Sequence, residues 1–160
     1  MKITTCLADY QNQQHGSDII ALMTEYAKDP MGGQQDLSDT VKSQLVENLA
    51  RIPGAVTVMA YDEERPVGLI NCFEGFSTFN CQPLLNIHDV IVTKDYRGQG
   101  ISHRMLEMIE QIAINRGCCK LTLEVLEGNQ TAQHAYQKFG FSAYELDPEM
   151  GKALFWEKML

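Results

Sequence analysis

A strand, a tight glycine turn and a long helix follow one another without a break in the middle of this chain. Leu84 to Thr93 is apolar at most positions, as a strand is, and the longest helical pattern runs from Ile101 to Arg116. The turn between them contains Gly98 and Gly100, and Gly117 supplies a C-terminal stop for the helix. This succession predicts a mixed α/β fold built around a strand–helix–strand unit.

The flanking sequence predicts further strands and helices on both sides of this unit. Two serines in front of amphipathic segments, Ser17 and Ser38, are expected to cap the first two helices. The expected helices are Ser17–Lys28, Ser38–Ala50, Ile101–Arg116 and Thr131–Phe139. The expected strands are Lys2–Leu7, Ala55–Tyr61, Val67–Phe79, Leu84–Thr93, Leu121–Leu126, Phe141–Leu146 and a last one that ends near Leu160.

The length and composition fit one compact domain that covers residues 1–160. Hydrophobic residues make up 44% of the chain, which is enough for a core, and the formal net charge is −8. An acidic chain lacks the basic face with which nucleic-acid binders displace counterions, so no nucleic acid is expected as a partner. The charge favours a cationic substrate, although acidity also serves solubility alone.

The chain contains five cysteines, which show neither a disulfide pattern nor the spacing of a zinc site. We therefore expect no metal and a reduced, cytoplasmic setting. No stretch approaches the roughly 18 apolar residues that a membrane span requires, so no membrane association is expected.

Two blocks of sequence carry the chemistry. The first runs from Arg97 to Ser102 with the pattern Arg-x-x-Gly-x-small, which differs from the glycine patterns of dinucleotide folds and P-loops. Its glycines allow close backbone approach and the amides of the following helix favour a phosphate, although a plain tight turn fits the same residues. The second block places Asn129 at the start of a helix and Tyr136 two turns later on the same side.

These blocks and the order of elements resemble the GNAT family of N-acetyltransferases over nearly the whole chain. The resemblance implies a single-domain GNAT fold, with a twisted, mixed but mostly antiparallel sheet of six to seven strands flanked by about four helices. It also implies acetyl-CoA as cosubstrate and transfer of its acetyl group to a primary amine. The last small position of the first block is usually Gly or Ala in that family and is Ser102 here.

The resemblance assigns roles to particular residues. The first block would bind the pyrophosphate of coenzyme A, and the strand before it would pair with the pantetheine arm. Tyr136 would hydrogen-bond or protonate the departing thiolate, and a backbone amide near Ile91 would polarise the thioester carbonyl. The expected coenzyme-binding residues are Val90, Ile91, Val92, Arg97, Gly98, Gln99, Gly100, Ile101, Ser102, His103 and Asn129.

His88 is the predicted general base or the anchor for a water relay, because an alkyl ammonium group must lose a proton before or during attack and imidazoles titrate near neutral pH. It lies just upstream of the strand segment expected to hold the thioester. A half-buried structural histidine is the alternative, and Glu74, Asp89 and Glu124 compete for the role. Asp89 also fits a structural role at a strand end, and Tyr136 also fits simple packing on a core.

The acceptor is predicted from a further resemblance. Phe76–Phe79 and Leu84–Val92 look like the matching segment of diamine and polyamine acetyltransferases, with His88 and Asp89 where those proteins carry two acidic residues. A small diamine- or polyamine-like amine is therefore the expected acceptor. Two other functions stay open, a protein N-terminal or lysine acetyltransferase and a non-catalytic acyl-CoA-binding regulatory module. A homodimer is the expected assembly.

Overall fold

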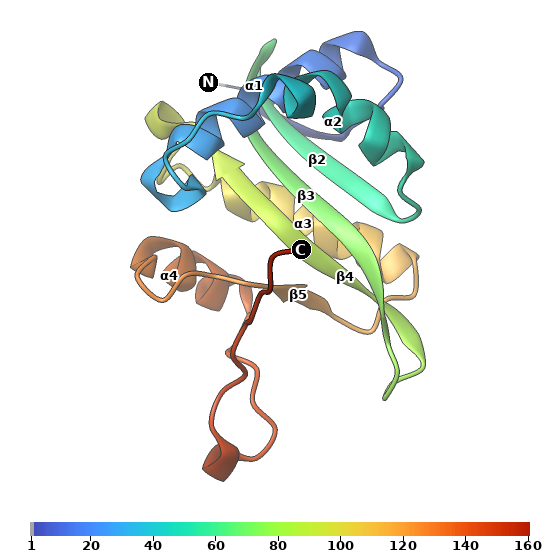
Figure 1. Ribbon diagram of the computed structural model, residues 1–160, viewed down its shortest axis with the longest axis vertical. Coiled ribbons are helices and arrows are strands. Elements are labelled where there is room, and N and C mark those ends of the chain that lie inside the picture. Colours follow the sequence, from blue (N-terminus) through green and yellow to red (C-terminus); the bar gives the residue numbers. More distant parts are fainter. Residues whose placement is uncertain (1) are drawn as a thin grey trace. The chain divides into compact units, whose positions relative to one another are not determined.

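The computed structural model describes residues 2–160, in which the chain divides into two compact units (Figure 1). The first unit ends at Leu123 and contains the sheet, and the second runs from Glu124 to Leu160. The helices are α1 (Gln13–Lys28), α2 (Asp39–Arg51), α3 (Ile101–Asn115) and α4 (Gln130–Phe139), with short 3-10 helices η1 (Pro30–Gly32), η2 (Lys94–Tyr96) and η3 (Pro148–Met150). The strands are β1 (Ile3–Leu7), β2 (Ala55–Asp62), β3 (Arg65–Ser77), β4 (Gln82–Val92) and β5 (Leu121–Leu123).

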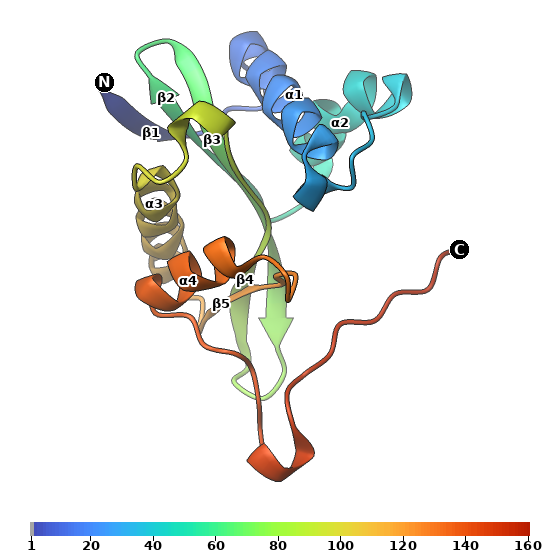
Figure 2. The same cartoon turned by 90° about the vertical axis from the view of Figure 1, so that its left-hand side faces the viewer.

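The sheet of the first unit has the strand order β1-β2-β3-β4-β5. Neighbouring strands are antiparallel except for the last pair, β4 and β5, which run parallel because α3 connects them. Helices α1 and α2 cover one face of the sheet and α3 covers the other (Figures 1 and 2). This arrangement confirms the predicted α/β fold and its central strand–helix–strand unit.

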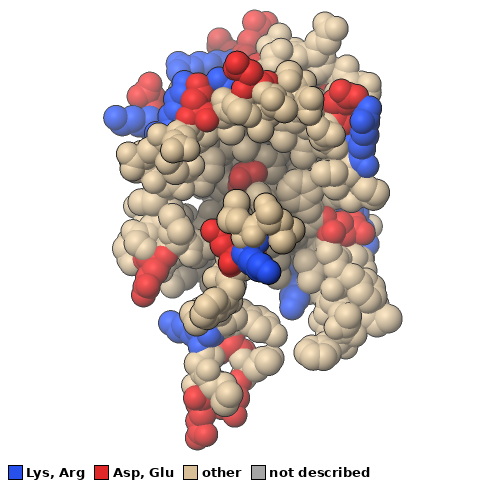
Figure 3. Space-filling view, viewed as in Figure 1, with Lys and Arg blue, Asp and Glu red and all other residues tan. Residues whose placement is uncertain are grey.

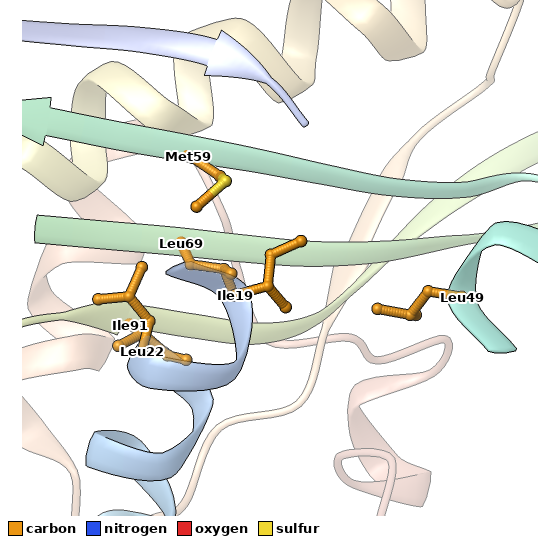
Figure 4. Packing of buried hydrophobic residues seen from close by; sticks show 6 residues of the cluster. All are labelled: Ile19, Leu22, Leu49, Met59, Leu69 and Ile91. Atoms are coloured by element: carbon orange, nitrogen blue, oxygen red, sulfur yellow. The ribbon is translucent and has the colours of Figure 1, made fainter. Parts of the chain in front are cut away.

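A buried cluster fixes α1 and α2 against the sheet. Ile19 and Leu22 of α1 and Leu49 of α2 pack with residues of the sheet, Met59 of β2 and Leu69 of β3 among them, and all are at most 4% exposed (Figure 4). Burying an aliphatic side chain of this size contributes roughly 1.5–3 kcal/mol relative to exposure. The cluster therefore holds the helix layer in place beside the strands that carry the candidate site.

The first helix begins five residues earlier than the sequence predicts. Asn12 is its N-cap, and Asn12 Oδ1 accepts from the backbone amides of Gln14 at 2.9 Å and His15 at 3.3 Å. Ser17, the predicted cap, lies inside the helix and donates to Gln13 O. An amide oxygen that satisfies two first-turn donors outcompetes a later serine.

Two expected cap residues are confirmed. Ser38 Oγ accepts from the amide of Val41 at 3.2 Å at the start of α2. Gly117 follows the end of α3 with a φ of 70°, as a C-terminal stop should.

The sheet has five strands and not the six to seven predicted. Neither Phe141–Leu146 nor the segment that ends near Leu160 forms a strand, and only Glu145 and Lys152 make an isolated antiparallel bridge. The last segment leaves its apolar residues exposed: Phe155 is 77% exposed and Trp156 is 81% exposed. A strand requires a partner for its backbone groups, which an apolar pattern alone does not supply.

Positive and negative side chains are intermixed over α1 and α2, at the top of Figure 3. Lys28 and Lys42, for example, both lie within 3.2 Å of the Asp36 carboxylate. Within residues 2–160, no helix is both long enough and apolar enough to cross a bilayer.

Candidate active site

One extra residue in β4 interrupts its pairing with β3. Cys72 lies opposite Ile87 and Asn71 lies opposite Asp89, so His88 has no cross-strand partner and forms a β-bulge. A bulge re-aims the side chains and backbone groups beside it. The predicted base therefore sits at the point where the strand changes direction.

Beyond the bulge, alternate backbone groups of β4 point away from β3. Thr93 N–H donates to Val67 O across this strand pair at 3.0 Å. Because backbone groups alternate in direction along a strand, Ile91 faces β3 as Thr93 does, and Val90 and Val92 face the opposite edge. The edge-facing amides near Ile91 are therefore those of Val90 and Val92.

This edge of β4 is open beyond Ile87. In residues 2–160, β5 pairs only with Leu85–Ile87, and no other strand follows on that side. One edge carbonyl is used internally, because Arg97 Nε donates to Val92 O at 3.0 Å. The remaining groups of Val90 and Val92 form a short ladder that an extended, amide-containing ligand is able to join.

The turn after β4 presents a row of backbone amides. Gly98 and Gly100 have φ values of 75° and 76°, in the left-handed region that favours glycine. Helix α3 begins at Ile101 with Gly100 as its N-cap and no side-chain cap, and no described residue accepts a hydrogen bond from the amides of residues 98–102. Uncapped amides at the positive end of a helix form an anion-binding site.

The other predicted residues of this turn shape it. The Ile101 side chain is 1% exposed and anchors the helix start in the core. Gln99 Nε2 donates to Asp95 O at 3.0 Å and braces the loop. Ser102 is half-buried, and His103 Nε2 lies 3.6 Å from Glu107 Oε1 one turn along the helix.

Arg97 is held by the loop between α1 and α2. Its Nη2 donates to Asp29 Oδ2 at 2.7 Å, and the Arg97 side chain is 51% exposed. The hydrogen bond from Arg97, with a second from the amide of Met31, lowers the pKa of Asp29 below its usual value. The pair ties the turn before α3 to a residue that sequence reasoning left out of the site.

His88 is exposed and stands against two neighbours. Its Nδ1 lies 3.4 Å from Asp89 Oδ2, and its ring meets Phe73 edge-on with centroids 5.5 Å apart. The Asp89 side chain is only 17% exposed, and Asp89 Oδ2 accepts from Asn71 Nδ2 at 3.0 Å. In the described residues no Lys or Arg pairs with Asp89, so its charge is left for a ligand or for His88.

The competing carboxylates differ in their surroundings. Glu74 Oε2 lies 3.4 Å from Arg116 Nη1, which engages it in an ion pair. Glu124 lies outside the unit that contains the bulge and the amide row. Within the first unit, Asp89 is the carboxylate that contacts His88.

The second unit contains the other two predicted residues. Asn129 is the N-cap of α4, and Asn129 Oδ1 accepts from the amide of Ala132 at 3.2 Å. Tyr136 is half-buried on α4 and meets Phe141 edge-on with ring centroids 6.0 Å apart. The asparagine therefore defines the start of α4, and the tyrosine places an aromatic hydroxyl two turns later on the same helix.

Sequence reasoning missed two buried polar residues that are linked by hydrogen bonds to Asp89. Asn71 and Thr57 are 3% and 1% exposed, and each interrupts a run of apolar residues within its strand. Buried polar side chains need partners, so a polar residue within such a strand is a signal that can be read from sequence. The identity of the partners depends on strand register, which the sequence pattern does not specify.

Comparison with known proteins places the chain among acetyltransferases. The profile described as "Acetyltransferase (GNAT) family" matches residues 19–141. Thialysine N-epsilon-acetyltransferase of Bos taurus is 35% identical over 54 residues, which cover 34% of this chain and 32% of that protein. N-alpha-acetyltransferase 30 of Schizosaccharomyces pombe is 25% identical over 112 residues, which cover 70% of this chain and 74% of that protein.

Solved structures agree with the fold. An aminoglycoside acetyltransferase, meta-AAC0020 from an uncultured soil metagenomic sample, superposes with a TM-score of 0.80 at 14% identity and covers 99% of this chain and 97% of its own. The match to the thialysine acetyltransferases spans only about a third of their length. The family profile nevertheless covers most of the chain, including the bulge, the amide row and α4. The chain therefore belongs to the GNAT acetyltransferase family.

Proposed function

We propose that this protein transfers the acetyl group of acetyl-CoA to a primary amine by direct attack. The observation that carries the proposal is the row of backbone amides from Gly98 to Ser102, for which the described residues provide no acceptor and which follows the open edge of β4 after the short helix η2. A diphosphate matches the amide row in charge, and an extended arm with two amide groups matches the strand edge. Coenzyme A joins these two chemical features in one molecule.

The direction of β4 orders the parts of the cosubstrate. The pyrophosphate lies on the amides at the start of α3, and the pantetheine arm runs back along Val92 and Val90 toward the bulge. The thioester then lies nearest to His88, and the Val90 amide polarises its carbonyl. The Asn129 amide group and the His103 side chain complete the coenzyme site by family resemblance.

The chemistry needs one base and one acid. His88 Nε2 takes a proton from the acceptor ammonium group, and the neutral amine attacks the thioester carbon. The tetrahedral intermediate collapses with cleavage of the C–S bond, and the Tyr136 hydroxyl gives its proton to the coenzyme A thiolate. The second proton on the attacking nitrogen is released through water and restores the Tyr136 hydroxyl, which leaves the neutral amide. Neither step requires a covalent enzyme intermediate or a metal ion, and residues 2–160 contain no group of His, Cys, Asp or Glu arranged to hold a metal.

A small cationic amine of the diamine or polyamine kind is the favoured acceptor. The net charge of −8 raises the local concentration of cations, and Asp89 presents a carboxylate without a Lys or Arg partner among the described residues. Burial and the carboxylates of Asp89 and Asp29 raise the pKa of Tyr26, which supports a negative potential beside β4.

Acetylation of a protein N-terminus or lysine is the second candidate. The 112-residue match to N-alpha-acetyltransferase 30 favours it, because that match covers more of the chain than the thialysine matches do. A non-catalytic acyl-CoA-binding module is the third. We also propose that residues 1–160 form one domain and that the protein is cytoplasmic. We further propose a homodimer, which light scattering tests.

A thiol-release assay with acetyl-CoA tests the function. Diamines, polyamines, amino acids, aminoglycosides and peptides are offered in parallel, and we expect turnover with diamines or polyamines. Tyr136→Phe should lower kcat without weakening coenzyme A binding. Turnover with peptides alone would favour the second candidate. Coenzyme A binding without thiol release for any amine would favour the third, and no coenzyme A binding would refute the proposal.

A further inference from the structure

A continuous chain of hydrogen-bonded side chains, buried at Thr57 and Asn71 and half-buried at both ends, crosses the sheet and ends beside His88. Tyr10 Oη lies 2.8 Å from Thr57 Oγ1, and Thr57 Oγ1 donates to Asn71 Oδ1 at 2.7 Å. Asn71 Nδ2 donates in turn to Asp89 Oδ2 at 3.0 Å. The chain runs from the loop after β1 through β2 and β3 to β4, where the bulge lies.

The donors of this chain all point in one direction. A carboxylate only accepts, so Asn71 turns its Nδ2 toward Asp89 and its Oδ1 toward Thr57. Thr57 has a single hydroxyl proton, which it gives to Asn71, so the Tyr10 hydroxyl donates to Thr57. Three successive donors therefore end on the Asp89 carboxylate, and each bond polarises the next.

The chain orients groups and does not conduct protons. The Asn71 amide group lies in its middle, and an amide nitrogen neither takes up nor releases protons readily near neutral pH. Asp89 Oδ2, which the chain holds, is also the oxygen 3.4 Å from His88 Nδ1. Fixing this oxygen keeps a negative charge beside one particular nitrogen of the imidazole, and that charge favours a proton on the same nitrogen.

We propose that Tyr10, Thr57 and Asn71 are positioning residues that hold the Asp89 carboxylate so that His88 keeps its proton on Nδ1 and presents Nε2 as the base. The partner of one ring nitrogen determines which nitrogen of a neutral histidine carries the proton. In hydrolase triads a carboxylate likewise holds the imidazole in one tautomer while the other ring nitrogen acts as the base. The inference rests on the proposed role of His88 as base.

The position of the proton is directly measurable. The full chain is labelled with ¹⁵N-histidine, and the ring nitrogen shifts are recorded without cosubstrate at about pH 9, where ordinary imidazoles are neutral. His88→Gln identifies the His88 signal among the four histidines. We expect the Nδ1–H form, whereas an imidazole free in water prefers Nε2–H. An Nε2–H signal for His88 in the unaltered protein would overturn the inference.

Thr57→Val removes the middle hydroxyl at nearly constant volume. We expect the His88 signal to move toward the Nε2–H form and kcat to fall about tenfold, with the KM for acetyl-CoA unchanged. Thr57→Ser should restore both values because it returns the hydroxyl. Thr122→Val is the matched control, since Thr122 accepts from Asn86 Nδ2 at 3.0 Å in the same sheet but lies outside the chain. Thr122→Val should leave the His88 signal unchanged.

The outcomes separate this inference from the proposed function. A Thr57→Val protein whose His88 signal equals that of the unaltered protein would overturn the positioning role. If Thr57→Val fails to fold, Tyr10→Phe makes the same test from the end of the chain, and an unmoved His88 signal there would overturn it equally. An Nδ1–H signal that responds to Thr57→Val in a protein without thiol release would support the positioning chain and refute the acetyltransferase.

Discussion

Gly100→Ala tests whether the amides before α3 bind a diphosphate, and Gly117→Ala is its matched control. The two glycines have φ values of 76° and 70°, and a Cβ added at either one meets no atom within 4 Å. They lie on either side of the 15-residue helix α3, roughly 25 Å apart at 1.5 Å per residue. The two substitutions therefore impose the same backbone strain at two distant places.

The expected loss of stability is the same for both variants. Without a steric clash only the left-handed conformation matters, and it costs an L residue about 1–2 kcal/mol. For a chain of this length that loss lowers Tm by roughly 3–6 °C. Thermal unfolding of the two variants should give shifts that agree within this range.

The expected effects on coenzyme A binding differ. At Gly100 the methyl group stands on the open surface of the amide row and displaces the phosphate from one amide. A charge-assisted hydrogen bond contributes about 1.5–3 kcal/mol, so the Kd for coenzyme A should rise about 10- to 150-fold. Gly117→Ala should leave the Kd unchanged. Calorimetry that finds equal affinities for the two variants would refute the diphosphate site.

Two further predictions concern charge and burial. The pKa of Asp29 is lowered in the folded state by its bond with Arg97, so the pair stabilises the fold above the unfolded-state pKa of about 3.9 and loses this effect as the pH falls through the folded-state value. Asp29→Asn keeps an acceptor for the cap of η1 but loses the charge that pairs with Arg97. Urea unfolding should therefore show a less stable variant at pH 7 and equal stabilities near about pH 2. A difference in stability that does not depend on pH would contradict this prediction. Burial raises the pKa of Cys72 to about 12, whereas Cys81 is exposed. Iodoacetamide at about pH 8 should therefore modify Cys81 and spare Cys72 in the folded protein, which mass spectrometry measures. Equal labelling of the two cysteines would contradict the burial of Cys72.

Local features of the fold were predictable. The turn between β4 and α3 depends on glycine backbone freedom, and the Ser38 cap and the Gly117 stop depend on groups within a few residues. The prediction that Ser17 caps the first helix was wrong, because Asn12 offers a better acceptor five residues earlier. Helices and turns form from neighbours in sequence, so their signals are present in the sequence itself.

The amino-acid sequence alone determined the succession of elements and the glycine turn that carries the proposed phosphate site. Only the tertiary structure decided which of the apolar segments pair as strands, that His88 occupies a bulge, and that Asn71 meets Asp89. It also joined Arg97 to Asp29 across 68 positions of sequence. The physical reason is that helix and turn bonds close between near neighbours, whereas strand pairing, register and buried polar partners depend on residues that are distant along the chain.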